Sequence, residues 1–174
     1  MIRDQEIDRL VNYIKGLGLK VSFTSKDEGI AASWSLDNTE IKICKNYNTT
    51  KIETILSLIH ELGHAKHNLW EKNREVDTKF ERALDHVDDA EEQETDTKKR
   101  QRKIILDNEI AGTRYWHDIY LETNMKFPIW KLDAAMEFDI WQYRVFYETG
   151  KDPKRKEKKK KLKEIKNKHR NKNG

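Results

Sequence analysis

Apolar residues recur three or four positions apart in two stretches of the first 70 residues, which is the spacing of an amphipathic helix. The first stretch covers residues 3–15 and ends at Gly16. The second covers residues 50–70, where Thr50 and Glu53 have the Thr-x-x-Glu form of a capping box that begins a helix. We therefore expect one helix over each range.

Between these helices, apolar and polar residues alternate as they do in β-strands. The alternation runs through residues 19–24, 30–36 and 40–45. Residues 37–39 have the composition of a tight turn, so the second and third strands should form a hairpin. The sequence thus predicts an α+β fold with an N-terminal helix, a three-stranded sheet and further helices towards the C-terminus.

After residue 70 the pattern weakens and later returns. Residues 71–102 are almost wholly polar, with seven acidic residues from Asp85 to Asp96, which predicts a charged insertion. This acidic cluster could bind a cation, although a solvated charge run is the more common use of such a segment. Helical periodicity resumes over residues 103–123 and again over 132–149, where aromatic residues at helical spacing predict core packing.

Charge is divided unevenly along the chain. Residues 151–174 contain 13 lysines and arginines against three acids, a net charge of +10, whereas residues 1–150 carry a net charge of −6. The basic segment has too few apolar residues to bury, so we expect a tail that is mainly disordered. Such tails bind polyanions, including nucleic acids, by releasing counterions. A role in solubility alone explains the composition equally well.

Composition argues against a membrane or secreted protein. No run of 18 apolar residues occurs, so no membrane span is expected, and the N-terminus lacks the apolar segment of a signal peptide. Cys44 is the only cysteine, which rules out a disulfide within the chain. These features favour a cytoplasmic location.

The helix predicted over residues 50–70 contains His60, Glu61 and His64 in an H-E-x-x-H motif. Residues four apart share one face of a helix, so His60 and His64 can both bind one metal ion. Glu61 lies about 100° round the helix, close enough to act on a water molecule. Zinc suits this site because it accepts imidazole and carboxylate ligands and keeps one position open for water. The motif therefore predicts a zinc-dependent hydrolase with Glu61 as its base.

A catalytic zinc ion needs a third protein ligand. Glu109 is our first choice because it lies at the edge of the apolar stripe of residues 103–123, where Ala111 and Gly112 permit close approach of another helix. His67 is the rival, but three ligands along one straight helix are too far apart for one tetrahedral ion. The weaker candidates are Asp107, Glu91, Glu92 and His117.

Two further parts of such a reaction can be assigned only in outline. The negative charge that develops on the substrate carbonyl oxygen calls for another hydrogen-bond donor, and Tyr115, His117 and Arg114 are the candidates. An extended peptide substrate could bind by adding to an exposed edge of the predicted sheet.

The order of elements and the motif Leu-x-x-x-His-Glu-Leu-Gly-His at residues 56–64 resemble the ImmA/IrrE family of small zinc metallopeptidases from bacteria, phages and mobile elements. The similar parts are residues 1–70 and 103–123. The resemblance implies a zincin-like metallopeptidase domain over residues 1–150, with 71–102 as an insertion.

The same resemblance implies a site and a substrate. By analogy with the family, His60, His64 and Glu109 would bind Zn2+ and Glu61 would be the catalytic base. The family's activity implies cleavage of a protein, such as a DNA-binding transcriptional repressor.

Two other functions fit the same residues. An SprT-like protease, which digests proteins bound to DNA, also uses H-E-x-x-H and would give the basic tail a role. Alternatively, the domain could be a non-catalytic scaffold whose tail acts on nucleic acid or a viral assembly. Glu61 speaks against the scaffold, because zinc binding does not require it.

Overall fold

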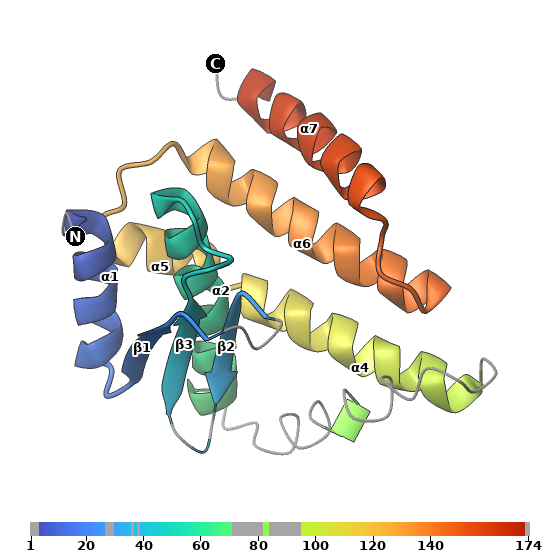
Figure 1. Ribbon diagram of the computed structural model, residues 1–174, viewed down its shortest axis with the longest axis horizontal. Coiled ribbons are helices and arrows are strands. Elements are labelled where there is room, and N and C mark those ends of the chain that lie inside the picture. The colour runs from blue at the N-terminus through green and yellow to red at the C-terminus, as the bar shows by residue number, and fades with distance from the viewer. Residues whose placement is uncertain are drawn as a thin grey trace. The chain divides into compact units, whose positions relative to one another are not determined.

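The computed structural model describes residues 4–26, 30–35, 37, 39–70, 82–83 and 95–172. It combines helices with one small mixed sheet, so the predicted α+β fold class is confirmed (Figure 1). Among the helices in these ranges, none is both long and apolar enough to span a membrane.

Contacts divide the chain into two compact units. The first unit comprises Met1–Glu71 and Gly112–Lys126, and the second comprises Lys72–Ala111 and Phe127–Gly174. The domain predicted over residues 1–150 stays a prediction.

The first unit is built on a sheet of strands β1 (Lys20–Thr24), β2 (Ala32–Ser35) and β3 (Glu40–Cys44). Strand β3 lies in the middle, parallel to β1 and antiparallel to β2, so the predicted hairpin is the β2–β3 pair. Ile41 and Ile43 of β3 are fully buried. The most apolar strand thus takes the central place, where both of its neighbours shield it from water.

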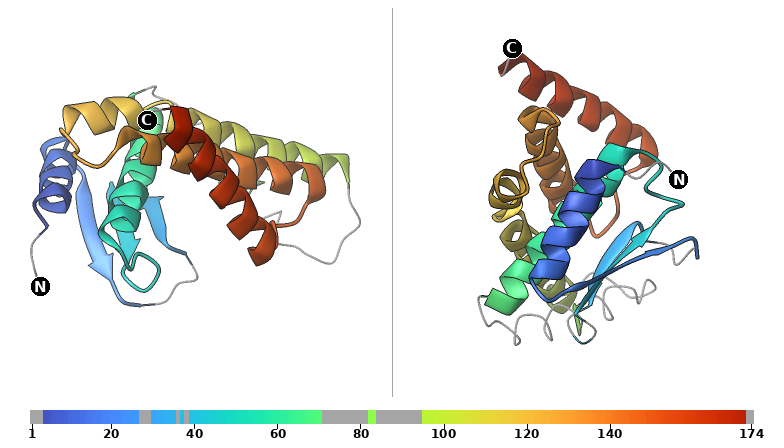
Figure 2. Two further views of the ribbon diagram at one scale, coloured as in Figure 1. Left: turned by 90° about the horizontal axis from the view of Figure 1, so that it is seen from above. Right: turned by 90° about the vertical axis from the view of Figure 1, so that its left-hand side faces the viewer.

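One face of this sheet is covered by helices. Helix α2 (Lys51–Trp70) packs against β2 and β3, and α1 (Gln5–Gly16) packs against β1 and α2 (Figure 2). Helix α5 (Trp116–Glu122) lies against α2 as well. The apolar stripe of α2, which includes the fully buried Leu58 and Leu62, faces this core.

The predicted capping box begins α2. The backbone N–H of Glu53 donates to Oγ1 of Thr50 at 3.2 Å, and the backbone N–H of Thr50 donates to Oε2 of Glu53 at 2.8 Å. The second of these hydrogen bonds is the main reason why the pKa of Glu53 lies below its ordinary value. The two hydrogen bonds give partners to backbone N–H groups at the start of the helix, which have no acceptor within the helix itself.

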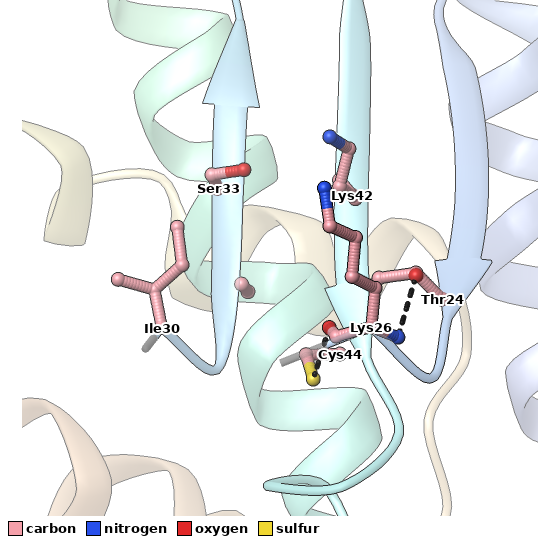
Figure 3. Close-up of a pocket in the computed structure, with 7 residues that line it drawn as sticks. Thr24, Lys26, Ile30, Ser33, Lys42 and Cys44 are labelled. Atoms are coloured by element: carbon pink, nitrogen blue, oxygen red, sulfur yellow. Dashed lines mark hydrogen bonds between the residues drawn. The ribbon is translucent and has the colours of Figure 1, made fainter. Parts of the chain in front are cut away.

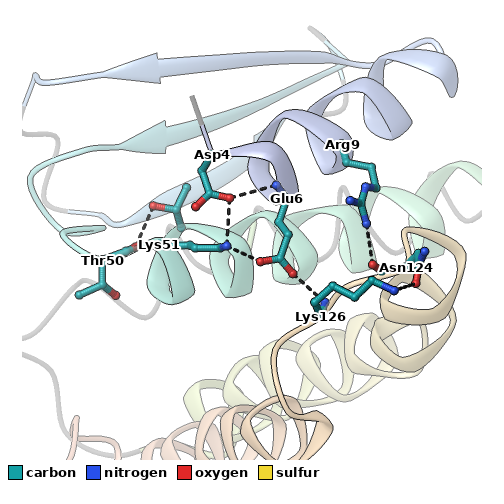
Figure 4. A network of polar contacts seen from close by, with 8 residues as sticks. Asp4, Glu6, Arg9, Thr50, Lys51, Asn124 and Lys126 are labelled. Carbon is teal, nitrogen blue, oxygen red and sulfur yellow. Dashed lines mark hydrogen bonds and ion pairs between the residues drawn. The ribbon is translucent and has the colours of Figure 1, made fainter. Parts of the chain in front are cut away.

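A network of polar contacts joins the starts of α1 and α2 to the segment after α5 (Figure 4). Lys51 forms ion pairs with Asp4, at 3.1 Å, and with Glu6. Glu6 also accepts a hydrogen bond from the backbone N–H of Lys126 at 2.6 Å, and Arg9 donates to the carbonyl oxygen of Asn124 at 2.6 Å. The segment that follows α5 is thereby attached to the N-terminal helix.

The second unit contains α4 (Asp96–Thr113) as far as Ala111, together with α6 (Ile129–Thr149) and α7 (Arg155–Lys172). Arg102 of α4 is buried, and its Nε donates to the carbonyl oxygen of Tyr147 at 3.1 Å. That carbonyl lies in the last turn of α6, where carbonyl groups have no partner within the helix.

The helix predicted over residues 103–123 is two helices in the structure. Helix α4 already starts at Asp96, within the predicted insertion, and ends at Thr113; Arg114 and Tyr115 then form a turn before α5. Glycine and β-branched threonine are weak helix formers, and Gly112 and Thr113 stand together where α4 ends. Of the predicted insertion, only residues 82–83 and 95–102 lie within the described ranges.

The basic C-terminal segment, expected to be mainly disordered, forms the helix α7. The backbone N–H of Lys154 donates to Oε2 of Glu157 at 2.8 Å, which caps the first turn. An acid in the first turn and cations in the last turn also suit the helix dipole. Ile165 is only 2% exposed, so α7 does bury one apolar side chain, and it packs along α6.

Candidate metal centre

Helix α2 places His60 and His64 on the same face, one turn apart. Their Nε2 atoms face each other at 3.1 Å, and the two rings are 4.8 Å apart between centroids, with an angle of 68° between planes. Two imidazole nitrogens bound to one tetrahedral zinc ion would be separated by about 3.3 Å. The two histidines are therefore spaced as ligands of a single ion.

Glu109 completes a group of three possible ligands. A carboxylate oxygen of Glu109 and one ring nitrogen each of His60 and His64 all lie within 4.8 Å of one another. Glu109 lies near the C-terminal end of α4, and the helix continues through Gly112 to Thr113. Glu109 is 5% exposed and His64 is 7% exposed, so these side chains are largely shielded from bulk water. The three residues can hold a metal ion.

Two glycines allow α4 and α2 to meet at this point. A Cβ atom on Gly63 would overlap the carbonyl oxygen of Gly112, and a Cβ atom on Gly112 would lie 2.9 Å from both Cε1 and Nδ1 of His64. Larger side chains would push the helices apart or displace the His64 ring. The sequence indicated that Gly112 permits a close approach, and this is confirmed; the role of Gly63 was not foreseen.

Glu61 lies beside the three ligand residues. Its Oε1 is 4.0 Å from Nε2 of His60, the atom that faces His64. Glu61 is 8% exposed, so its carboxylate is in a largely dry environment. It is thus placed next to the position that a metal ion would take, without belonging to the group of ligands.

Trp116 is a component of this centre that the sequence did not reveal. Its side chain is 1% exposed, and its indole ring meets the His60 ring edge to face, with 5.6 Å between centroids and an angle of 72°. Contact with a rigid, buried indole limits rotation of the imidazole. Because Trp116 begins α5, only the three-dimensional packing of α5 on α2 brings it here.

Among the residues that the structure describes, the other sequence candidates take no part in the group of ligands. His67 is buried one turn beyond His64 and is not in the group. Asp107 is exposed and pairs with Lys103 on the surface of α4. His117 is exposed on α5, as is Arg114 in the preceding turn, while Tyr115 is half-buried. Glu91 and Glu92 lie outside the described residues.

A small pocket on the sheet has a different character (Figure 3). Its lining includes Lys26, which follows β1, Ser33 of β2, and Lys42 and the buried Cys44 of β3. The Cys44 thiol donates to the carbonyl oxygen of Lys26 at 3.4 Å. Its polar side chains are cationic or neutral, so this pocket does not resemble a cation site.

Comparison with protein-family models, with curated proteins and with solved structures finds no match for this chain. The resemblance to ImmA/IrrE peptidases therefore rests on the motif and on the order of elements, and it stays a prediction. The fold and the site define an α+β protein in which two histidines and one carboxylate form a group able to hold a metal ion.

Proposed function

We propose that this protein is a zinc-dependent endopeptidase that hydrolyses a peptide bond in a protein substrate. The observation that carries the proposal is the convergence of His60, His64 and Glu109 within 4.8 Å, with Glu61 next to them. None of these four side chains would need to come together to stabilise an ordinary helical core.

The donor set suits zinc. Two imidazole nitrogens and one carboxylate oxygen are the protein ligands of a common class of hydrolytic zinc site, and three such ligands leave one coordination position for water. Ferrous iron also uses two histidines and one carboxylate. The adjacent non-ligand carboxylate of Glu61 favours zinc, because hydrolysis requires a base at that place and iron-dependent oxidation does not.

When bound, zinc would act as a Lewis acid that lowers the pKa of a coordinated water molecule and polarises the scissile carbonyl group. Glu61 would accept a proton from the attacking water and pass it to the amine nitrogen as the C–N bond breaks. Trp116 would hold the His60 ring in its orientation through the edge-to-face contact. Burial of Glu61 and Glu109 would strengthen their electrostatic interactions at the site, because little bulk water screens them.

The substrate would be a protein. Within the described part of the chain, the outer strands β1 and β2 each have one edge without a neighbouring strand, and an extended peptide could pair with such an edge. By analogy with the ImmA/IrrE family, the substrate would be a DNA-binding regulator such as a transcriptional repressor.

The test compares the wild type with Glu61→Gln. Both proteins should bind one zinc ion per chain, measured by elemental analysis after purification. Cleavage of a peptide library from a bacterial proteome should fall by about a hundredfold or more in Glu61→Gln, because general-base catalysis is lost. Matched cleavage by the two proteins, or iron in place of zinc, would contradict the proposal.

Two further arms separate the alternatives. A DNA-binding protein offered free and bound to DNA distinguishes a peptidase of regulators from one that requires DNA-bound substrates. A protein that holds zinc firmly but cleaves nothing in either arm would instead be a scaffold.

A further inference from the structure

Helix α7 gathers positive charge on one of its faces. Six exposed cationic residues fall within an arc of about 120° when the helix advances by about 100° per residue. Neither acid of the helix, Glu157 or Glu164, falls within this arc. We call this surface the outer face of α7; it consists of Lys156, Lys159, Lys160, Lys163, Lys166 and Arg170.

Contacts on the opposite side fix the direction of the outer face. Ile165 is 2% exposed, and Glu137 of α6 accepts hydrogen bonds from Nζ of Lys168 at 2.6 Å and pairs with Nε2 of His169 at 2.7 Å. One apolar anchor and a charged cluster next to it set the rotation of α7 about its own axis. The six cations are therefore presented together as a preformed surface.

The outer face lacks partners within the described part of the chain. None of the residues described in the structure forms a hydrogen bond or an ion pair with the six outer-face side chains. The neighbouring Lys158 and Lys161, by contrast, pair with Asp152 and Glu164. Six like charges held close together repel one another, and a polyanion would relieve that repulsion.

We infer that the outer face of α7 binds the phosphate backbone of a double-stranded nucleic acid. From Lys156 to Arg170 the face is about 21 Å long, and a duplex carries one negative charge for about every 1.7 Å of its axis. A rigid cationic strip of this length can contact several phosphates at once. The contacts involve the backbone, so binding does not depend on base sequence.

The composition of the outer face separates this partner from two others. The face contains no aromatic residue on which the bases of a single strand could stack. The apolar residues Leu162 and Ile165 are on the inner side, so none remains on the outer face to enter a lipid bilayer.

The experiment measures binding of the full chain to a short fluorescent duplex DNA across a series of salt concentrations. If all six cations reach phosphates, the logarithm of the association constant should fall with the logarithm of salt with a slope of about −5. The triple variant Lys159→Gln, Lys163→Gln, Lys166→Gln should reduce the slope to about −3 and weaken binding by about tenfold or more at low salt.

A matched control removes the same charge elsewhere. Lys15, Lys20 and Lys45 are exposed on the first unit, and their replacement by glutamine should leave the slope close to that of the wild type. Circular dichroism of both triple variants verifies that helix content is retained. Equal weakening by the two sets of substitutions would overturn the inference.

Two competing ligands complete the design. Single-stranded DNA that binds as tightly as the duplex would overturn the choice of a double strand. Binding to phosphatidylserine vesicles but not to duplex DNA would show that the face serves a membrane surface instead.

Discussion

Gly112 lies so close to His64 that a Cβ atom at position 112 would be 2.9 Å from Nδ1 of the imidazole ring. That distance is well inside ordinary van der Waals contact, so the absence of a side chain at residue 112 is a condition for the present position of His64. The relationship connects the geometry of a helix crossing directly to the metal centre.

We predict that Gly112→Ala weakens zinc binding by about tenfold or more, because the added methyl group displaces a ligand ring. The measurement is competition with a chromophoric chelator. Gly16→Ala is the matched control, since a Cβ atom there meets nothing within 4 Å. If Gly112→Ala and Gly16→Ala bound zinc with the same affinity, the proposed link between residue 112 and the site would be wrong.

Replacement of the carboxylate ligand should have a larger effect. Glu109→Gln should lower zinc affinity by about a hundredfold, because a neutral amide is a much poorer ligand for zinc than a carboxylate. Asp107→Asn removes one negative charge from the exposed side of the same helix and should leave the affinity unchanged. Undiminished zinc binding by Glu109→Gln would direct the search for a third ligand elsewhere.

The capping box at the start of α2 should stabilise the folded protein. Thr50→Ala should lower the free energy of unfolding by about 1 kcal/mol, as is usual when an N-cap is lost. Urea denaturation in the presence of a chelator measures this loss without interference from metal binding.

Glu53→Gln tests the charge of the same box. The folded state lowers the pKa of Glu53 from its ordinary 4.5, so the stabilisation by its carboxylate is present above that pH and is lost as pH falls through the folded value. The stability difference between wild type and Glu53→Gln should therefore be largest near neutrality and decrease as the pH falls below 4.5. A difference that stayed constant over this range would exclude the charge as its cause.

Helix α7 should depend on its single buried anchor. Ile165→Ala should destabilise the docked helix by about 2–4 kcal/mol, the usual cost of truncating a buried isoleucine. The measurement is amide hydrogen exchange, which should accelerate throughout α7 while the exchange of α2 stays slow. The exposed Lys166→Ala serves as the control, and α7 should exchange in that variant as in the wild type.

The sequence predicted best those features that depend on neighbouring residues. The helix over residues 50–70, its capping box and the hairpin of the second and third strands all follow from local patterns, and the structure contains them. The spacing of His60 and His64 also follows from the geometry of one helix. The role of Glu109 was harder to predict because it depends on the packing of two helices. The small residues Ala111 and Gly112 suggest such packing but do not specify it.

Other features required long-range information. No local sequence pattern indicates that β3 lies between β1 and β2, or that Trp116 packs on His60. Helix α7 was missed because a lysine-rich composition predicts solvation, while its docking relies on Ile165 and on Glu137 from another helix. The turn at Arg114 and Tyr115 divides a stretch whose apolar periodicity continues on both sides.

The central position of β3 affects how the sheet can assemble. Among the described strands, β1 pairs with β3 alone, and β3 follows it in the chain only after β2. The β2–β3 hairpin can close locally within microseconds, whereas β1 must wait for that hairpin and close a longer loop. A nascent chain that has emerged only as far as Thr39 therefore contains β1 and β2 but not the strand with which both of them pair, and β1 joins the sheet only after the β2–β3 hairpin has formed.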